Sequence, residues 1–166
     1  MAVSAYEVIS TQTLASATAT VTFSSIPQTY TDLVLVLLVG ASTGGNAMKL
    51  ELNGDTASNY STTYLAGNGS SATSTRTSSN TTMRLFHSFA CDTAITNMAT
   101  INFLNYSNAT TYKTVLSRCG CTTGTEAEVN LWRSTAAITT FNCYWGSGYT
   151  FPVGSIFTLY GVKAAA

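Results

Sequence analysis

Apolar and polar residues alternate along four short segments of this chain. Because successive side chains of a β-strand point to opposite faces, a period of two marks a strand with one buried face and one exposed face. The four segments are 16–23, 48–52, 99–103 and 126–131. We expect a strand at each, with the apolar set turned inward, which for the last segment means Ala127, Val129 and Leu131.

Further segments have the composition of strands although their alternation is less regular. They are rich in β-branched and aromatic residues, and they are 60–65, 83–89, 112–119, 138–145 and 156–162. No segment has the apolar stripe of an amphipathic helix. Eight to ten closely spaced strands predict an all-β chain, folded over residues 1–166 as a single-domain antiparallel β-sandwich with a jelly roll as the expected topology.

The final apolar segment is expected to be a paired strand that completes the core. Alternation places Phe157 and Leu159 on one face, with Ile156 and Tyr160 on the other. A terminal strand that carries this much apolar surface is held in a sheet, because otherwise it would fray into water.

Segment 33–39 is apolar at every position, Leu-Val-Leu-Val-Leu-Leu-Val. Only one face of a strand meets the core of a two-layer sandwich, so the second face needs cover from a loop of the same chain or from another subunit. We expect a subunit contact, and thus a dimer or trimer. The candidate interface residues are Leu33, Leu35, Leu37 and Val39; the alternative is a central strand shielded by its own loops.

Two polar segments punctuate this pattern. The tract 67–82 consists almost entirely of Gly, Ser, Thr and Asn, and we expect an exposed loop there, with a polar edge hairpin as the alternative because threonine tolerates strands. Asn53-Gly54-Asp55 predicts a hairpin turn.

Charge is scarce, because only 8% of the residues are charged and the net charge is zero. Basic residues occur singly, so nucleic-acid binding is not expected. Low charge favours an assembled state over a dispersed one. The N-terminus lacks the basic residues of a secretory signal, and the seven apolar residues of 33–39 fall far short of the roughly 20 that span a bilayer. We therefore expect a protein that is kept inside the cell where it is made, without a membrane span.

Four cysteines, Cys91, Cys119, Cys121 and Cys143, could in principle hold a tetrahedral zinc. Cys119 and Cys121 are separated by one residue, whereas zinc knuckles usually have two or more between their ligands, and the other two cysteines stand alone. We expect no metal or cofactor, and buried free thiols instead, with a disulfide as the alternative after release from a lysed host.

The sequence does not predict an enzyme. His87 is the only histidine, and it shares a strand face with apolar neighbours, as a packed histidine does. Glu126 and Glu128 lie on one strand face about 7 Å apart by strand geometry, but we interpret them as solvated surface charge rather than as a glycosidase pair.

Aromatic residues gather before the last strand, and exposed rings can stack on sugars or anchor an interface. Most are expected in the core. Tyr149, between Gly148 and Thr150, is the ring that we expect to meet solvent or a partner.

The C-terminal segment Gly154-Ser-x-Phe-x-Leu-Tyr-Gly-x-Lys163 resembles the last strand of many small virion proteins of tailed bacteriophages. The resemblance extends to segments 22–36, 52–60, 105–118 and 131–133. It implies a virion structural protein, assembled in the cytoplasm of a bacterial host and carried in the virion. We expect capsid decoration on the outside of the head, with the major capsid protein or other virion proteins as partners. The alternative is a tail-fibre or receptor-binding module that recognises host surface glycans.

Overall fold

The computed structural model describes residues 5–42, 47–86, 92–95 and 97–163. Twelve strands and one short 3-10 helix, η1 (Gly146–Gly148), lie within this part of the chain. The strands are β1 (Tyr6–Thr13), β2 (Thr20–Phe23), β3 (Asp32–Val39), β4 (Met48–Leu52), β5 (Tyr60–Gly67), β6 (Ala72–Asn80), β7 (Met83–Leu85), β8 (Asn97–Leu104), β9 (Lys113–Cys121), β10 (Gly124–Trp132), β11 (Phe141–Trp145) and β12 (Ile156–Val162).

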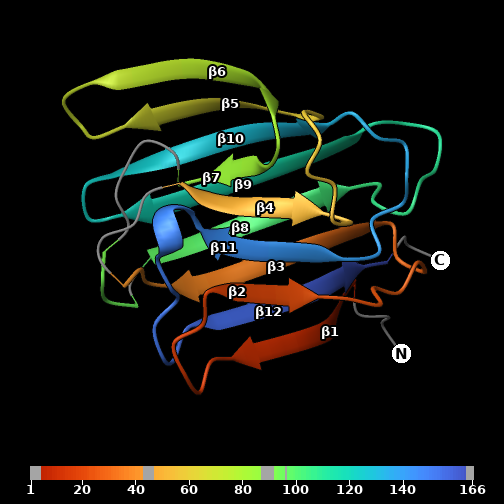
Figure 1. The fold of residues 1–166 in the computed structure, drawn as a ribbon, viewed down its shortest axis with the longest axis horizontal. Helices are drawn as coiled ribbons and strands as arrows, with labels where there is room; N and C mark the ends of the chain where they lie inside the picture. The colour runs from red at the N-terminus through yellow and green to blue at the C-terminus, as the bar shows by residue number, and fades with distance from the viewer. Residues whose placement is uncertain (1–4, 43–46, 87–91, 96, 164–166) are drawn as a thin grey trace.

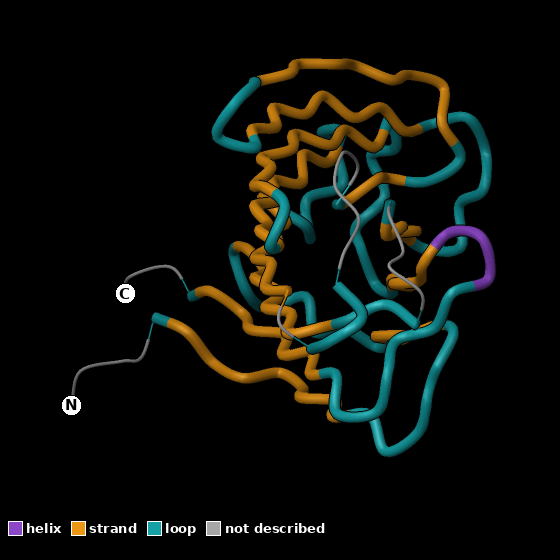
Figure 2. The backbone as a smooth tube through the Cα atoms, turned by 90° about the vertical axis from the view of Figure 1, so that its left-hand side faces the viewer, coloured by secondary structure: helices purple, strands orange, loops and turns teal. Residues whose placement is uncertain are grey.

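These strands form two antiparallel sheets that pack face to face (Figure 1). The large sheet has eight strands in the order β1-β12-β3-β8-β9-β10-β5-β6, and the small sheet has four in the order β2-β11-β4-β7. The expected all-β antiparallel sandwich is therefore confirmed. Figure 2 shows the two sheets edge-on, with the large sheet as the left-hand layer.

The strand order is that of an extended jelly roll. When the β5–β6 and β9–β10 hairpins are set aside, four strands remain in each sheet, ordered β1-β12-β3-β8 and β2-β11-β4-β7. The chain then alternates between the sheets as it does in a jelly roll. Both hairpins join the same edge of the large sheet, next to β8, and this addition makes the two sheets unequal in width.

The core fills the space between the sheets. Its largest fully buried side chains include Trp132, Tyr60, Tyr106, Phe103 and Phe141. Aromatic rings stack within it: the ring centroids of Phe23 and Phe141, neighbours in the small sheet, are 5.0 Å apart, and Phe103 of the large sheet lies at the same distance from Phe141. Rings buried in contact in this way add to the stability that area burial alone provides.

The last strand behaves as expected. β12 pairs with β1 on one side and with β3 on the other. Phe157 and Leu159 are fully buried, whereas Ile156 and Tyr160 lie on the opposite face and are only partly covered.

Two loop predictions need correction. The tract 67–82 is mostly the edge strand β6, which pairs with β5, so the edge hairpin is correct and the loop is not. At the Asn53-Gly54-Asp55 turn, Asn53 and Gly54 have φ values of 51° and 68°, which Asn and Gly tolerate best. The turn exists, but it does not make a hairpin, because β4 and β5 belong to different sheets.

Candidate interaction surface

The predicted interface residues do not lie on a surface. Leu33, Leu35, Leu37 and Val39 point between the sheets and are fully buried in the core, so the prediction that these four meet a partner is wrong. The reason is that a strand apolar on both faces gives no signal for which set faces inward. The opposite set, Val34, Val36 and Leu38, points outward from the large sheet.

The outer face of the large sheet is apolar over most of its width. Strand registers place its side chains in continuous rows; one row runs from Leu65 through Ala127, Arg118 and Thr100 to Val36. Seven of the nine large hydrophobic side chains that are exposed in the described part of the chain lie on this face: Tyr6, Val8, Leu38, Leu65, Met98, Leu104 and Val129. No described helix or strand covers them (Figure 2). A sheet face that gathers this many exposed large hydrophobic side chains is a candidate site of interaction.

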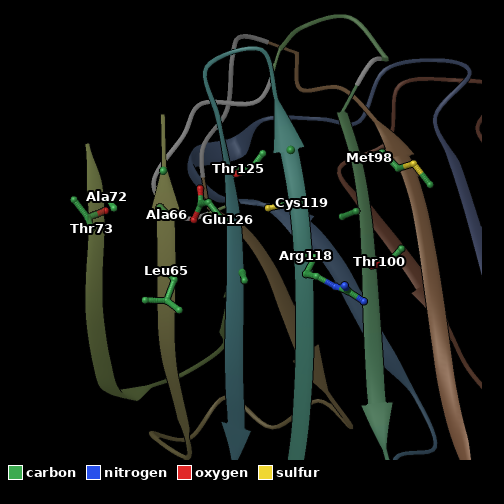
Figure 3. A pocket seen from close by; sticks show the side chains of 14 residues that line it. Leu65, Ala66, Ala72, Thr73, Met98, Thr100, Arg118, Cys119, Thr125 and Glu126 are labelled. Atoms are coloured by element: carbon green, nitrogen blue, oxygen red, sulfur yellow. The ribbon is translucent and has the colours of Figure 1, made fainter. Parts of the chain in front are cut away.

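A shallow depression of about 760 Å³ lies on this face and is lined by residues of β6, β5, β10, β9 and β8. Residues without large side chains, among them Gly67, Gly120 and Ala127, line it, and Leu65 and Met98 project beside them with 61% and 55% of their surface exposed. Figure 3 shows Arg118 lying along the sheet between β9 and β8. A second hollow of about 290 Å³ adjoins the first and shares Leu65, Arg118 and Ala127 with it.

Charge is almost absent from the outer face of the large sheet. The described charged side chains there are Asp32 at the start of β3, Arg76 on the edge strand β6 and Arg118 on β9. Asp32 accepts a hydrogen bond from the backbone N–H of Asn105 at 2.5 Å. Arg118 forms neither an ion pair nor a hydrogen bond within the described ranges.

The outer face of the small sheet is polar by contrast. Its strands turn Thr20, Thr22, Lys49, Glu51, Asn142 and Tyr144 outward. Thr22 donates to Asn142 Oδ1 at 2.7 Å, and Asn142 Nδ2 donates to Glu51 at 3.4 Å. Burial and then the nearby Glu51 carboxylate raise the pKa of Tyr144. The two outer surfaces of the sandwich therefore differ in chemistry.

Glu126 and Glu128 are not solvated surface charges, and this expectation also needs correction. Both side chains point between the sheets and are buried, while Ala127 and Val129 of the same strand face outward. Ser117 donates a hydrogen bond to Glu128, and Thr62 donates to Asn130 Oδ1 at 2.5 Å. The alternation along β10 is real, but its polar set faces inward.

Tyr149 follows η1 and is partly buried against the core. The Tyr149 ring is therefore more buried than the sequence suggests. It does not belong to the outer face of the large sheet, which the strands of that sheet form. Its neighbours Trp145 and Phe151 are core residues with ring centroids 5.6 Å apart.

Three of the four cysteines lie within the described residues. Cys119 and Cys143 are buried thiols and Cys121 is partly exposed; burial raises the pKa of Cys143. The described residues contain no group of three or more His, Cys, Asp or Glu side chains placed to hold a metal. His87 and Cys91 lie outside the described residues.

Among the described residues, no helix has the length and apolar character needed to cross a membrane. Comparison of the chain with protein-family models, with curated proteins and with solved structures finds no match.

Proposed function

We propose that the protein is a structural subunit of a bacteriophage virion, and specifically a capsid decoration protein bound to the outside of the head. The resemblance of its sequence segments, above all 154–163, to small virion proteins supports the proposal. The chemistry of its two outer surfaces supports it independently.

The contrast between these surfaces carries the proposal. The large sheet turns exposed side chains such as Leu65, Met98 and Val129 outward, whereas the small sheet turns threonine, amide and charged groups outward. A protein that decorates a shell needs one surface that loses water on binding and one that stays hydrated. We assign the outer face of the large sheet to contacts within the assembly and that of the small sheet to solvent. The major capsid protein or another virion protein is then the partner.

The number of copies per virion tests the proposal. Purified virions are digested, and the protein is quantified by mass spectrometry against the major capsid protein. On the order of hundreds of copies supports decoration, because a shell repeats its lattice sites many times. A few dozen copies or fewer would assign the protein to the tail, and its absence from the virion would refute the proposal.

The alternative is a tail-fibre or receptor-binding module that recognises host glycans, and one observation favours it. Tyr144 lies on the polar outer face of the small sheet, beside Lys49 and Glu51 on β4 and two residues from Asn142. A partly exposed ring among hydrogen-bonding groups can stack on a sugar while its neighbours bind hydroxyl groups. If host polysaccharide binds the protein and the Tyr144→Ala variant loses that binding, the receptor-binding function is supported over decoration.

A further inference from the structure

We infer that a second copy of this chain packs on the outer face of the large sheet, with Arg118 of each copy paired to Asp32 of the other. The inference concerns the purified protein and does not rest on the virion role. It starts from the charges of an otherwise apolar face. Packing any surface on this face would remove water from Arg118, and a guanidinium that loses water needs an acceptor.

The acceptor is available on the same face. Among the described residues, Asp32 is the only carboxylate there. It uses Oδ1 for the N–H of Asn105, and Oδ2 has no hydrogen bond within the described chain. Arg118 is opposite Thr100, and Thr100 is opposite Val36, so Arg118 and Val36 lie in one row across the sheet. Asp32 is on the same strand as Val36, so it lies two strands from Arg118 and two rows further along the sheet. The two side chains are then roughly 16 Å apart by strand geometry, too far to pair within one copy.

Symmetry brings them together. Asn102 is opposite both Leu116 and Val34, which places it midway between Arg118 and Asp32. In a two-fold dimer, a residue that contacts a second residue is contacted by it in return. The required two-fold axis lies between the facing sheets, passes over Asn102 and is perpendicular to the line from Arg118 to Asp32. Rotation about this axis places Arg118 of each copy opposite Asp32 of the other.

The residue on the axis suits its position. Asn102 meets Asn102 of the partner subunit there, and a side-chain amide carries both donors and acceptors. Two such amides can bind each other reciprocally without any other polar group. The Asn102 side chain is partly buried and forms no hydrogen bond within the described ranges.

The apolar residues follow the same symmetry. For flat sheets, this axis makes the strands of the two copies cross at roughly 70°, as in orthogonal sheet packing. Leu38 then lies over Val8 of the partner subunit, and Val129 lies near Leu104 of the partner subunit. All four side chains are among the exposed hydrophobic residues of the isolated chain.

The area is sufficient for a stable dimer. Crossed sheets overlap over a square about as wide as the strands are long, so strands of about eight residues cover roughly 700 Å² per copy. Stable interfaces of standard size bury about 800 Å² per partner. Leu65 and the part of the depression formed by β5 and β6 lie beyond this overlap, so the dimer leaves them open to another partner.

Charge exchange tests the pairing. Analytical ultracentrifugation measures self-association of the wild-type protein, of Arg118→Asp, of Asp32→Arg and of the double variant. We expect the wild type to dimerise. Each single variant places like charges opposite each other twice per dimer, so its dissociation constant should rise at least tenfold. The double variant exchanges the two charges and should return to within about threefold of the wild type.

Arg76→Asp is the matched control, since Arg76 lies on the same face but at the β6 edge, outside the overlap. It should leave dimerisation unchanged. Thermal melting verifies that each variant is folded; if Asp32→Arg unfolds because the Asn105 contact is lost, the comparison of Arg118→Asp with Arg76→Asp decides alone. The inference is overturned by a wild type that stays monomeric at high concentration, by an oligomer that Arg118→Asp leaves intact, or by a folded double variant as weak as the single ones.

Discussion

The indole Nε1 of Trp132 donates a hydrogen bond to Asp55 Oδ2 at 2.7 Å. This bond ties β10 of the large sheet to the turn that follows β4 of the small sheet. The same carboxylate accepts from Asn59 Nδ2 and from the backbone N–H of Ala57, each at 2.9 Å. One side chain thus holds the connection between the two layers.

Asp55→Ala should destabilise the fold by about 1 to 3 kcal/mol, because the largely buried indole N–H of Trp132 loses its acceptor. Thr56→Ala, an exposed neighbour in the same turn, is the control and should change little. Urea denaturation measures both. Equal stability of Asp55→Ala and the wild type would show that the bond between the layers contributes nothing.

Asp55 also predicts part of the acid sensitivity of the protein. Burial acts to raise the pKa of this carboxyl, but the hydrogen bonds from Asn59, Trp132 and Ala57 outweigh it and hold the pKa below its usual value. A pKa lowered by folding contributes stability above the unfolded value of about 3.9, and the contribution is lost as pH falls from there through the folded pKa. The free energy of unfolding should therefore decline more steeply below about pH 4 in the wild type than in Asp55→Asn. Parallel pH profiles for the two proteins would contradict this assignment.

Gly161→Ala should destabilise the last strand. A Cβ atom at Gly161 would lie 2.4 Å from the Tyr30 ring, which packs against the strand at this position. Relieving such a contact costs about 1 to 3 kcal/mol. Gly120→Ala is the matched control, because there the nearest atom, Thr125 Cγ2, is 3.6 Å away. If a Tyr30→Ala change does not rescue part of the loss in Gly161→Ala, the steric explanation is wrong.

Removal of residues 156–166 should abolish folding. β12 lies between β1 and β3 and contributes the buried side chains Phe157 and Leu159, each worth about 1.5 to 3 kcal/mol when fully buried. That loss, with β1 left without a partner and β3 paired only with β8, approaches the total stability of a typical domain. The truncated chain should be insoluble or lack a cooperative melting transition. A soluble truncation with the wild-type melting temperature would show that β12 is an accessory strand.

Cysteine reactivity should follow burial. Cys143 is fully buried and its thiol pKa is raised, so it should react with a disulfide reagent only after unfolding. Cys121 is partly exposed and should react in the native protein. Rates are compared in variants that retain only one of these two cysteines, the others being replaced by serine. Equal native rates would contradict the burial assigned to Cys143.

The fold was predictable where apolar signal was strong. Segments 33–39 and 156–162 are strongly apolar, and they form the adjacent strands β3 and β12 in the large sheet. The sequence pattern does not predict β1, because its alternation is interrupted by an irregularity between Val8 and Ser10. The sequence of β6 predicts a loop more strongly than a strand, because its Ser and Thr residues form no apolar face; the strand is exposed on both sides over most of its length.

The interaction surface could not be predicted from periodicity alone. Along β10, alternation distinguishes Glu128 from Val129, but it does not say which of them faces the core. The sequence-based assumption that the apolar set is buried fails there, because Val129 is exposed and Glu128 is buried. Trp132 carries the missing signal: it shares the Glu128 face, and a tryptophan at that end of the strand is better placed in the core.

Oxidation of Met98 tests the central claim, that the outer face of the large sheet is the assembly surface. Met98 is 55% exposed on this face, whereas Met48 and Met83 are buried in the core and serve as internal controls. Dilute peroxide converts exposed methionine to its sulfoxide, and peptide mass spectrometry measures the conversion in purified virions and in the isolated protein, which is diluted until it is monomeric so that dimerisation does not itself cover Met98. We predict that Met98 is oxidised in the isolated protein and protected at least tenfold in the virion, since burial limits access of the oxidant. Equal rates of Met98 oxidation in the two samples would contradict the account.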